Sequence, residues 1–426
     1  MTQDREAMAR EHLSFAHDLV KARAEQGFVI RSAQSLLQEA QQALEAAAFN
    51  QALRLAAQAS AAARSARMRP DFPYREPSTL EEITAALPGD GASLPAGPEA
   101  LSPEAYLDRC WGGWLGKNIG GALGGPVEGW PREKILATYG EVWDYVKKPP
   151  STLNDDTAYE VLALHALEQY GLEVTSEQLG LEWVEHLPQA YTAERVALEN
   201  LRRGIMPPES ALWNNPYSEW IGGQMKGEIW GLIAPGLPEA AMEYAYRDGI
   251  IAHEKNGVYG EIFDAVLISA AFVEPDPRRL LEIGLSYVPE QSRFAEVVRR
   301  TTAWCDAPTW QEAWAQVEAT YAKDYHPVHT FPAIAAVVIG LLYGNGDFEK
   351  ALCITNMCGL DTDCTAGQTG AIMGVICGAA TIPPKWKDPV GDDFDTYVIG
   401  FEKLKTSEVA QRTCAIGRQV TAKWRH

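Results

Sequence analysis

Beyond residue 105 the sequence consists of long segments with apolar residues at helical spacing, separated by short breaks of Gly, Pro and Asn. Apolar residues that recur every three or four positions mark one face of a helix, whereas strict alternation, which marks strands, is nearly absent here. We therefore expect an all-α domain, an antiparallel helix bundle with sites at helix ends. The predicted helices span residues 106–115, 158–170, 176–186, 193–203, 238–251, 259–273, 277–288, 292–302, 309–321, 333–342, 348–357 and 365–377.

The first part of the chain predicts a separate module. Residues 5–69 are rich in Ala, Gln, Glu, Leu and Arg and predict a helical hairpin or short bundle, interrupted at Gly27 and at Phe49–Asn50. Pro and Gly recur between residues 68 and 103, where only 80–87 predicts a short helix. We therefore expect an N-terminal helical hairpin or bundle at 1–69, a linker at 70–103 and a large domain at 104–426. A lone helix pair cannot bury its apolar face, so the N-terminal helices are expected to mediate oligomerisation or a partner contact.

Charge and cysteine content exclude several classes of protein. The formal net charge is −20, and clustered Lys and Arg are not evident, which argues against a nucleic-acid groove. The sequence begins without an apolar signal segment, and its uncharged stretches are too short to span a bilayer. The seven cysteines form no C-x-x-C pair and suggest reduced thiols. We expect a cytoplasmic protein without a membrane partner.

Two acidic motifs lie far apart in the sequence, each at the start of a predicted helix. The first, Asn154-Asp155-Asp156-Thr157, reads by itself equally well as a helix cap with acids that complement the helix dipole. The second, residues 359–365, contains Asp361 and Asp363 and leads into a helix with glycines three or four residues apart. Such glycines reduce helix stability by about 1 kcal/mol each but let another backbone approach closely.

Four carboxylates from two helix starts would repel one another unless a cation neutralised them. Hard oxygen ligands select Mg²⁺ or Mn²⁺ rather than zinc or copper, so we favour a binuclear metal site over a pair of acidic surface patches. A third segment, residues 112–129, is dense in glycine and contains Glu128, an acid that packing explains poorly. It is not a phosphate loop, because no G-K-[ST] sequence ends it.

Together these segments resemble the ADP-ribosylglycohydrolase family (dinitrogenase reductase-activating glycohydrolase-like), whose members carry G-D-A-L-G-x-P-x-E, then T-D-D-T, then G-G-D-T-D-T before a Gly-rich helix. The matching positions are 120–128, 154–157 and 359–364, and the resemblance covers about residues 106 to 385. It implies an all-α fold with two Mg²⁺ ions in a central cleft, Mn²⁺ being an alternative, that contact the hydroxyls of a ribose.

The resemblance also implies roles for individual residues. Glu128 is the implied catalytic acid/base, and the implied metal ligands are Asn154, Asp155, Asp156, Asp361 and Asp363. The segment 221–226 looks like the family's glycine loop, and 252–260 like a substrate-lining loop. The implied substrate-binding residues are Gly222, Gly223, Gln224, His253, Gly257, Tyr259 and Gly260.

Three positions depart from the family pattern. Asn154 replaces Thr, although its amide oxygen can still bind magnesium. Cys364 stands where the family has a Thr ligand, and sulfur is a poor partner for a hard cation, so we expect Thr365 or water to replace it. Gly121 replaces an Asp, which predicts a different substrate pocket.

The resulting hypothesis is a magnesium-dependent hydrolase that cleaves an N-glycosidic bond in an ADP-ribosylated protein or a small ribosyl-containing molecule. One alternative is a non-catalytic ADP-ribose- or metal-binding protein of the same fold, which the intact acids disfavour. A terpene-synthase-like magnesium enzyme is a weaker alternative, because its D-D-x-x-D motif needs an acid at Tyr159. The leaving group cannot be read from the sequence, because variable loops contact it.

Overall fold

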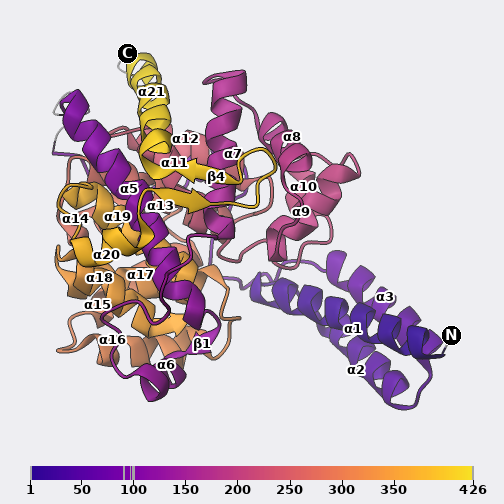
Figure 1. Ribbon diagram of the computed structural model, residues 1–426. Helices are drawn as coiled ribbons and strands as arrows, with labels where there is room; N and C mark the ends of the chain where they lie inside the picture. Colours follow the sequence, from indigo (N-terminus) through magenta and orange to yellow (C-terminus); the bar gives the residue numbers. More distant parts are fainter. Residues whose placement is uncertain (1, 90–91, 96, 98–100, 425–426) are drawn as a thin grey trace. The chain divides into compact units, whose positions relative to one another are not determined.

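The computed structural model describes residues 2–89, 92–95, 97 and 101–424, so positions 90, 91, 96 and 98–100 of the predicted linker lie outside the described residues. Over the described part the regular secondary structure is almost wholly helical, with two short two-stranded sheets (Figure 1). It divides into two compact units. Unit 1 contains residues 1–74 and 212–218, and unit 2 contains residues 75–211 and 219–426.

Unit 1 contains three helices, α1 (Thr2–Glu25), α2 (Arg31–Glu45) and α3 (Phe49–Arg64), and is a short bundle rather than a two-helix hairpin. Its core consists largely of Ala and Leu side chains. Gly27 follows α1 with a positive φ of 86° and packs against the ring of Phe72, which leaves no room for a Cβ atom. The Tyr217 hydroxyl donates to Asp18 at 2.9 Å and ties residues 212–218 to α1.

Unit 2 contains the remaining elements. Its helices are α4 (Leu80–Thr84), α5 (Pro103–Gly124), α6 (Arg132–Tyr139), α7 (Asp155–Tyr170), α8 (Ser176–His186), α9 (Thr192–Arg202), α10 (Glu209–Leu212, whose last residue is grouped with unit 1), α11 (Glu228–Leu232), α12 (Pro238–Gly249), α13 (Asn256–Ala271), α14 (Pro277–Leu285), α15 (Arg293–Trp304), α16 (Trp310–Val317), α17 (Thr330–Gly344), α18 (Phe348–Cys358), α19 (Thr362–Cys377), α20 (Pro384–Val390) and α21 (Thr406–Trp424). Its strands are β1 (Trp130–Pro131), β2 (Gly359–Leu360), β3 (Asp393–Asp395) and β4 (Lys403–Lys405).

Each helix predicted beyond residue 105 has a counterpart, and the all-α prediction is confirmed. Two differences stand out. Helix α5 continues through the Gly-rich segment to Gly124, where the sequence predicted an end at residue 115. Helix α21 was not predicted at all, although Val409, Thr413, Ile416 and Val420 form a buried face at helical spacing.

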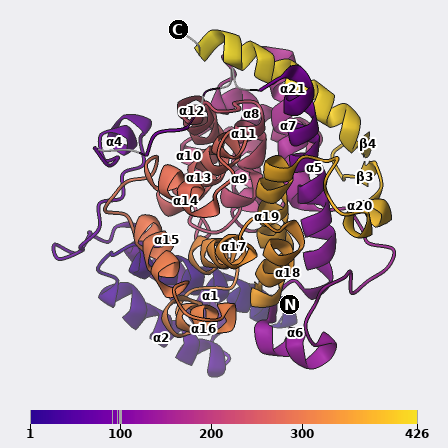
Figure 2. The same ribbon diagram turned by 90° about the vertical axis from the view of Figure 1, so that its left-hand side faces the viewer.

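Helices α13, α17 and α19 form the buried centre of unit 2, and every residue of α13 is buried. Helix α5 runs antiparallel to α19 in close contact (Figure 2). The contact consists of backbone against backbone: a Cβ atom on Gly112 would lie 2.1 Å from the carbonyl oxygen of Gly374, and one on Gly116 would lie 1.9 Å from that of Gly370. The glycine spacing had predicted such an approach, and α5 is the partner.

The antiparallel contact places the end of α5 beside the start of α19. The Thr362 hydroxyl donates to the Gly124 carbonyl oxygen at 2.9 Å, and the Gly129 amide donates to the Leu360 carbonyl oxygen at 2.7 Å. Strands β1 and β2 then pair antiparallel, with Trp130 opposite Leu360. These contacts hold the Glu128 turn beside the second acidic motif, although about 230 residues separate them in sequence.

The described residues of the predicted linker from Arg75 onward belong to unit 2. The Glu76 carboxylate accepts from the Arg293 guanidinium at 2.7 and 2.8 Å, and the Ala92 amide donates to the Ser286 hydroxyl at 2.8 Å. These residues therefore belong structurally to the larger unit. Among the described residues, no helix combines the length and apolar character needed to cross a membrane.

Candidate functional site

A pocket of about 640 Å³ opens in unit 2 where α5, α7, α9 and α19 begin or end, and its volume is ordinary for a small-molecule site. Acidic, glycine and aromatic residues share its wall. The lining residues are Gly121, Ala122, Gly125, Pro126, Glu128, Lys147, Ser151, Leu153, Asn154, Asp155, Gln189, Tyr191, Thr192, Glu194, Ile221, Gly222, Met225, Val328, Asp361, Asp363, Cys364 and Tyr397.

The predicted acids meet in this region as two overlapping groups. Carboxylate oxygens of Glu128, Asp361 and Asp363 lie within 4.8 Å of one another. A second group within the same limit contains Asp156, Asp363 and the sulfur of Cys364. Asp363 belongs to both groups, so two neighbouring cation positions that share this carboxylate are geometrically feasible. Asp155 lines the pocket but belongs to neither group.

The burial and the raised pKa values of the clustered carboxylates are what a site for divalent cations requires. The Oδ1 atom of Asp363 is buried and has no hydrogen-bond partner, and the buried Oδ2 atom of Asp156 forms an ion pair with Lys117 at 3.2 Å. Burial and the charges of neighbouring acids raise the pKa of Asp363 well above its usual range, and burial above all raises that of Asp361 to about 7. Such carboxylates gain stability when a cation replaces the lost water.

A buried lysine compensates part of the negative charge. The Lys117 Nζ atom, on α5, lies 2.6 Å from Glu228, 3.2 Å from Asp156 and 3.9 Å from Glu160. Although burial opposes it, these three carboxylates raise the pKa of Lys117, which keeps the ammonium charged. Lys117 therefore holds Asp156 in position behind the pocket wall. A lysine inside an otherwise apolar, Gly-rich segment was the signal, and the sequence reading had passed over it.

Two departures from the family pattern prove to be neighbours. Asn154 caps α7, since its Oδ1 atom accepts from the Asp156 amide at 2.9 Å. Its Nδ2 atom lies 2.7 Å from the position that a Cβ atom on Gly121 would occupy. The side-chain amide of Asn154 thus uses space that a side chain at position 121 would need. Both residues line the pocket, so the two departures from the family pattern together change the pocket wall.

The other departure leaves a thiol at the centre of the acid cluster. The Cys364 sulfur lies 3.3 Å from Asp156 Oδ1 and 3.6 Å from the sulfur of Met225, and burial raises the pKa of the thiol. Thr365, predicted as the replacement ligand, donates its hydroxyl to the Asp361 carbonyl oxygen at 2.8 Å. Thr365 does not line the pocket, and its role as a replacement ligand stays a prediction.

Among the predicted substrate-binding residues, only Gly222 lines the pocket. A Cβ atom on Gly222 would lie 1.8 Å from Glu194 Oε1, so this glycine makes room for the Glu194 carboxylate. His253 is buried, and its Nε2 atom lies 2.7 Å from the same oxygen. His253 therefore contacts a residue of the pocket wall, Glu194. Sequence reasoning missed Glu194 because it lies in an ordinary amphipathic helix.

The remaining predicted substrate-binding residues lie away from the pocket wall. Gln224 bridges Gln368 and the Thr330 hydroxyl at 2.7 and 2.8 Å. Gly223 packs against the backbone of Gly257. Gly260 packs against Gln224, and Tyr259 donates its hydroxyl to the Pro77 carbonyl oxygen. These residues contribute packing in the segments that support the pocket.

The family description ADP-ribosylglycohydrolase matches residues 102–415, which include every residue of the pocket wall. The chain belongs to the ADP-ribosylglycohydrolase family. The resemblance found in the three motifs is thereby confirmed, and membership supports a glycohydrolase-type function with a metal-dependent site.

One sequence relative and one solved structure are similar to this chain. An uncharacterized protein of Archaeoglobus fulgidus is 25% identical over 300 residues, covering 65% of this chain and 90% of the archaeal protein. A solved structure described as an ADP-ribosylglycohydrolase-related protein complex superposes with a TM-score of 0.53 at 21% identity, covering 74% of this chain and 99% of the other. That likeness supports the fold alone.

Proposed function

We propose that this protein is a magnesium-dependent hydrolase that cleaves the N-glycosidic bond of an ADP-ribosyl or related ribosyl group. The observation that carries the proposal is the convergence of Glu128, Asp361 and Asp363 within 4.8 Å at an open pocket. Its proposed substrate is an ADP-ribosylated protein or a small ribosyl-containing molecule. Family membership supports the glycohydrolase class, and the oxygen donors favour Mg²⁺ or Mn²⁺.

Asp156, Asp361 and Asp363, which belong to the two groups of converging ligand atoms, would hold the two cations. Asp155 and Asn154, which line the pocket outside both groups, are the further ligands that the family resemblance implies. When bound, the ions would hold and orient the ribose hydroxyls. Lys117 holds Asp156 by an ion pair and so keeps the first acidic motif facing the second. Held in this way, the carboxylates stay close together on one side of the pocket, as a site that must orient a sugar ring requires.

Glu128 is the proposed acid/base. Its side chain is exposed to the pocket. Partial desolvation by the surrounding protein raises the pKa of Glu128, and the negative charge of Asp156 raises it further. In the proposed reaction Glu128 accepts a proton from a water molecule as the water oxygen bonds to the anomeric carbon. The N-glycosidic bond breaks, its electron pair leaves with the nitrogen, and the nitrogen takes up the proton that Glu128 accepted, which returns Glu128 to the carboxylate.

The direct test is turnover of a substrate panel by the purified full-length chain with Mg²⁺. ADP-ribosylated peptides, ADP-ribosylated nucleic-acid ends and free N-ribosides cover the candidate leaving groups. Release of the ribosyl product from at least one member, abolished in Asp363→Asn, supports the proposal. Tight ADP-ribose binding without turnover of any member would favour the non-catalytic alternative.

We expect Mg²⁺ or Mn²⁺ to raise the melting temperature, because ligation relieves repulsion among the buried acids. At 100 times the dissociation constant, the stabilisation is about 2.7 kcal/mol. Calorimetry with and without metal measures it, and Asp361→Asn combined with Asp363→Asn should remove it. Glu133→Gln, an exposed acid outside the pocket, serves as the control. Undiminished metal binding in the double variant would rule out this cluster.

Cys364→Thr is expected to shift metal preference toward Mg²⁺. The thiol lies among the acids where a hydroxyl oxygen would suit a hard cation better, so the wild-type chain should favour Mn²⁺ or Cd²⁺ over Mg²⁺ more strongly than the variant does. Isothermal titration with each ion gives the ratio of affinities. An unchanged ratio would show that position 364 does not contact the metal.

A further inference from the structure

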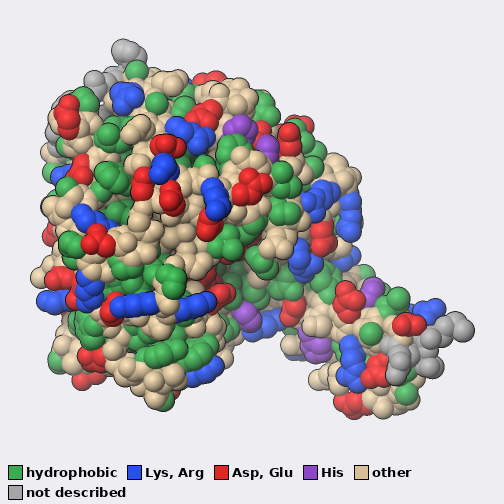
Figure 3. Space-filling model, viewed as in Figure 1, with side chains coloured by type: hydrophobic (Ala, Val, Ile, Leu, Met, Phe, Trp, Pro, Cys, Tyr) green, Lys and Arg blue, Asp and Glu red, His purple; other side chains and the backbone are tan. Residues whose placement is uncertain are grey.

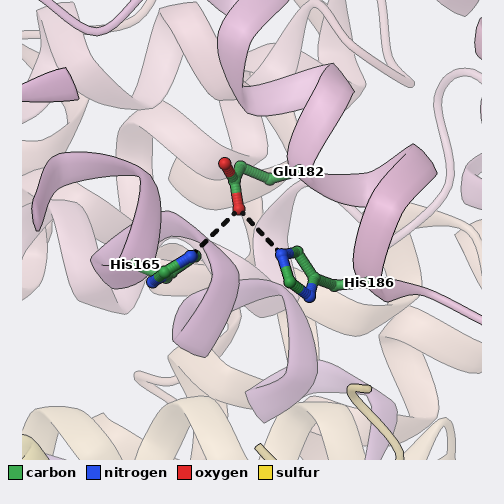
Figure 4. Close-up of side chains that lie close together, drawn as sticks. All are labelled: His165, Glu182 and His186. Carbon is green, nitrogen blue, oxygen red and sulfur yellow. Dashed lines mark ion pairs between the residues drawn. The ribbon is translucent and has the colours of Figure 1, made fainter. Parts of the chain in front are cut away.

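A second cluster of possible ligands lies outside the pocket. His165 comes from α7, while Glu182 and His186 come from successive turns of α8. The Nε2 atoms of both imidazoles lie 3.5 Å from the same carboxylate oxygen, Glu182 Oε2, and one ligand atom from each of the three residues lies within 4.8 Å of the others (Figure 4). Helix α8 begins with a capping box between Thr175 and Gln178, which fixes its first turn.

The separations fit a shared ion better than direct hydrogen bonds. Charge-assisted N–H···O bonds measure about 2.7–2.9 Å, well below the 3.5 Å found for both histidines. In a tetrahedral zinc site with bonds of about 2.0–2.1 Å, neighbouring ligand atoms lie about 3.3 Å apart. Glu182 Oε2 is buried and has no hydrogen-bond partner. Both histidine nitrogens therefore lie at ion-pair distance from the carboxylate oxygen without forming a hydrogen bond to it.

The hydrogen bond made by the other ring nitrogen of His186 also favours a shared ion. Its Nδ1 atom lies 2.9 Å from the Ile399 carbonyl oxygen, which can only accept, so Nδ1 carries the proton. In the neutral ring, Nε2 then presents a lone pair to the lone pairs of Glu182. Histidine ligands of metals are typically oriented in this way by a backbone carbonyl on the other nitrogen.

We propose that His165, Glu182 and His186 form a binding site for a zinc-type divalent ion, with the fourth position open to solvent. Two imidazoles and one carboxylate suit Zn²⁺, whereas the oxygen-rich pocket suits Mg²⁺. The side chains of His165 and His186 are 19% and 17% exposed, and Figure 3 shows histidines reaching the surface over α7 and α8. An ion can therefore enter.

This site is distinct from the acid cluster but structurally linked to it. His165 lies about ten residues along α7 from Asp155, a distance of about 15 Å. The connection between β3 and β4 contacts both histidines, since Phe401 packs 4.8 Å from the His165 ring and Ile399 accepts from His186. The same connection contributes Tyr397 to the pocket wall. A bound ion would hold α7, α8 and this connection together.

The test uses the full-length chain without a polyhistidine tag, stripped with a chelator and kept in excess Mg²⁺ to saturate the acid cluster. Zn²⁺ affinity and stoichiometry are measured by competition with a chromogenic chelator. One tightly bound Zn²⁺ per chain is expected, and His165→Ala or His186→Ala should weaken it at least about 100-fold, since even outer partners of a zinc site contribute about 10- to 100-fold. His12→Ala and His17→Ala, both exposed in α1, are the matched controls.

Further readouts separate the possible outcomes. Zn²⁺ should raise the melting temperature of the wild-type chain but not that of a folded His186→Gln or Glu182→Gln variant, and circular dichroism establishes that each variant is folded. Zinc binding that survives the histidine variants but is lost in Asp361→Asn with Asp363→Asn would overturn the proposal. So would the absence of tight zinc binding. Either result leaves the proposed hydrolase function untouched.

Discussion

Glu128→Gln is expected to lower turnover by about 10²-fold or more, the usual loss when general acid–base help is removed, while metal affinity stays close to wild type. Glu128 is exposed to the pocket, whereas Asp361 and Asp363 are buried. Its pKa is raised by the surrounding protein and by Asp156, which brings the carboxyl closer to the pKa that proton transfer near neutral pH requires. Glutamine keeps the shape and removes the proton acceptor.

The measurement is kcat and KM on a substrate that the wild-type chain cleaves, with Mg²⁺ affinity determined in parallel. Glu133→Gln makes the same chemical change five residues further along, outside the pocket, and should leave turnover unchanged. Turnover of Glu128→Gln within a few-fold of wild type would move the acid–base role elsewhere. Asp155 would be the next candidate, since it lines the pocket outside both metal groups and burial raises its pKa.

The sequence identified the acids that the structure brings into one cluster because each motif is short and lies at a helix start. Asp361 and Asp363 are two positions apart, and a helix beginning at Thr362 presents both toward its N-terminal end. Their roles as ligands, like that of Glu128 as acid/base, remain predictions. The helix periods were equally local signals, which is why the predicted helices have counterparts in the structure.

Features that depend on long-range contacts could not be read in this way. Glu194 lies in the first turn of an ordinary helix, and only the fold brings it against Gly222 and His253. The Asn154 side chain occupies the space beside Gly121, although the two positions are 33 residues apart in sequence and no local pattern links them. Sequence reasoning had assigned Gly222 to a substrate loop, which stays a prediction, and only the fold shows that its small size also makes room for the Glu194 carboxylate.

The extent of α5 was underestimated for a similar reason. Glycine weakens an isolated helix by about 1 kcal/mol per residue, so the segment after residue 115 resembled a loop. In the fold, Gly116, Gly120 and Gly124 form one row that fits against the backbone of α19. The four-residue spacing of these glycines matched that of Gly370 and Gly374, and the match between the two rows was the available signal.

Gly116→Ala is expected to destabilise the fold by at least about 2 kcal/mol and to weaken metal binding. The new methyl would lie 1.9 Å from the Gly370 carbonyl oxygen, and backbone cannot rotate away as a side chain can. Forcing α5 from α19 should exceed the usual overpacking range of about 1–3 kcal/mol, against a helix-propensity gain of about 1 kcal/mol.

Separation of these helices would also move Glu128 away from Asp361 and Asp363, because the Glu128 turn follows α5 and both aspartates lie at the start of α19. Denaturant unfolding and Mg²⁺ titration measure the two effects. Gly180→Ala in α8 is the matched control: its methyl would meet only the flexible end of Leu201, so its stability should change by less than about 1 kcal/mol. If Gly116→Ala matched this control in both measurements, close backbone packing of α5 on α19 would not be what holds the two halves of the site together.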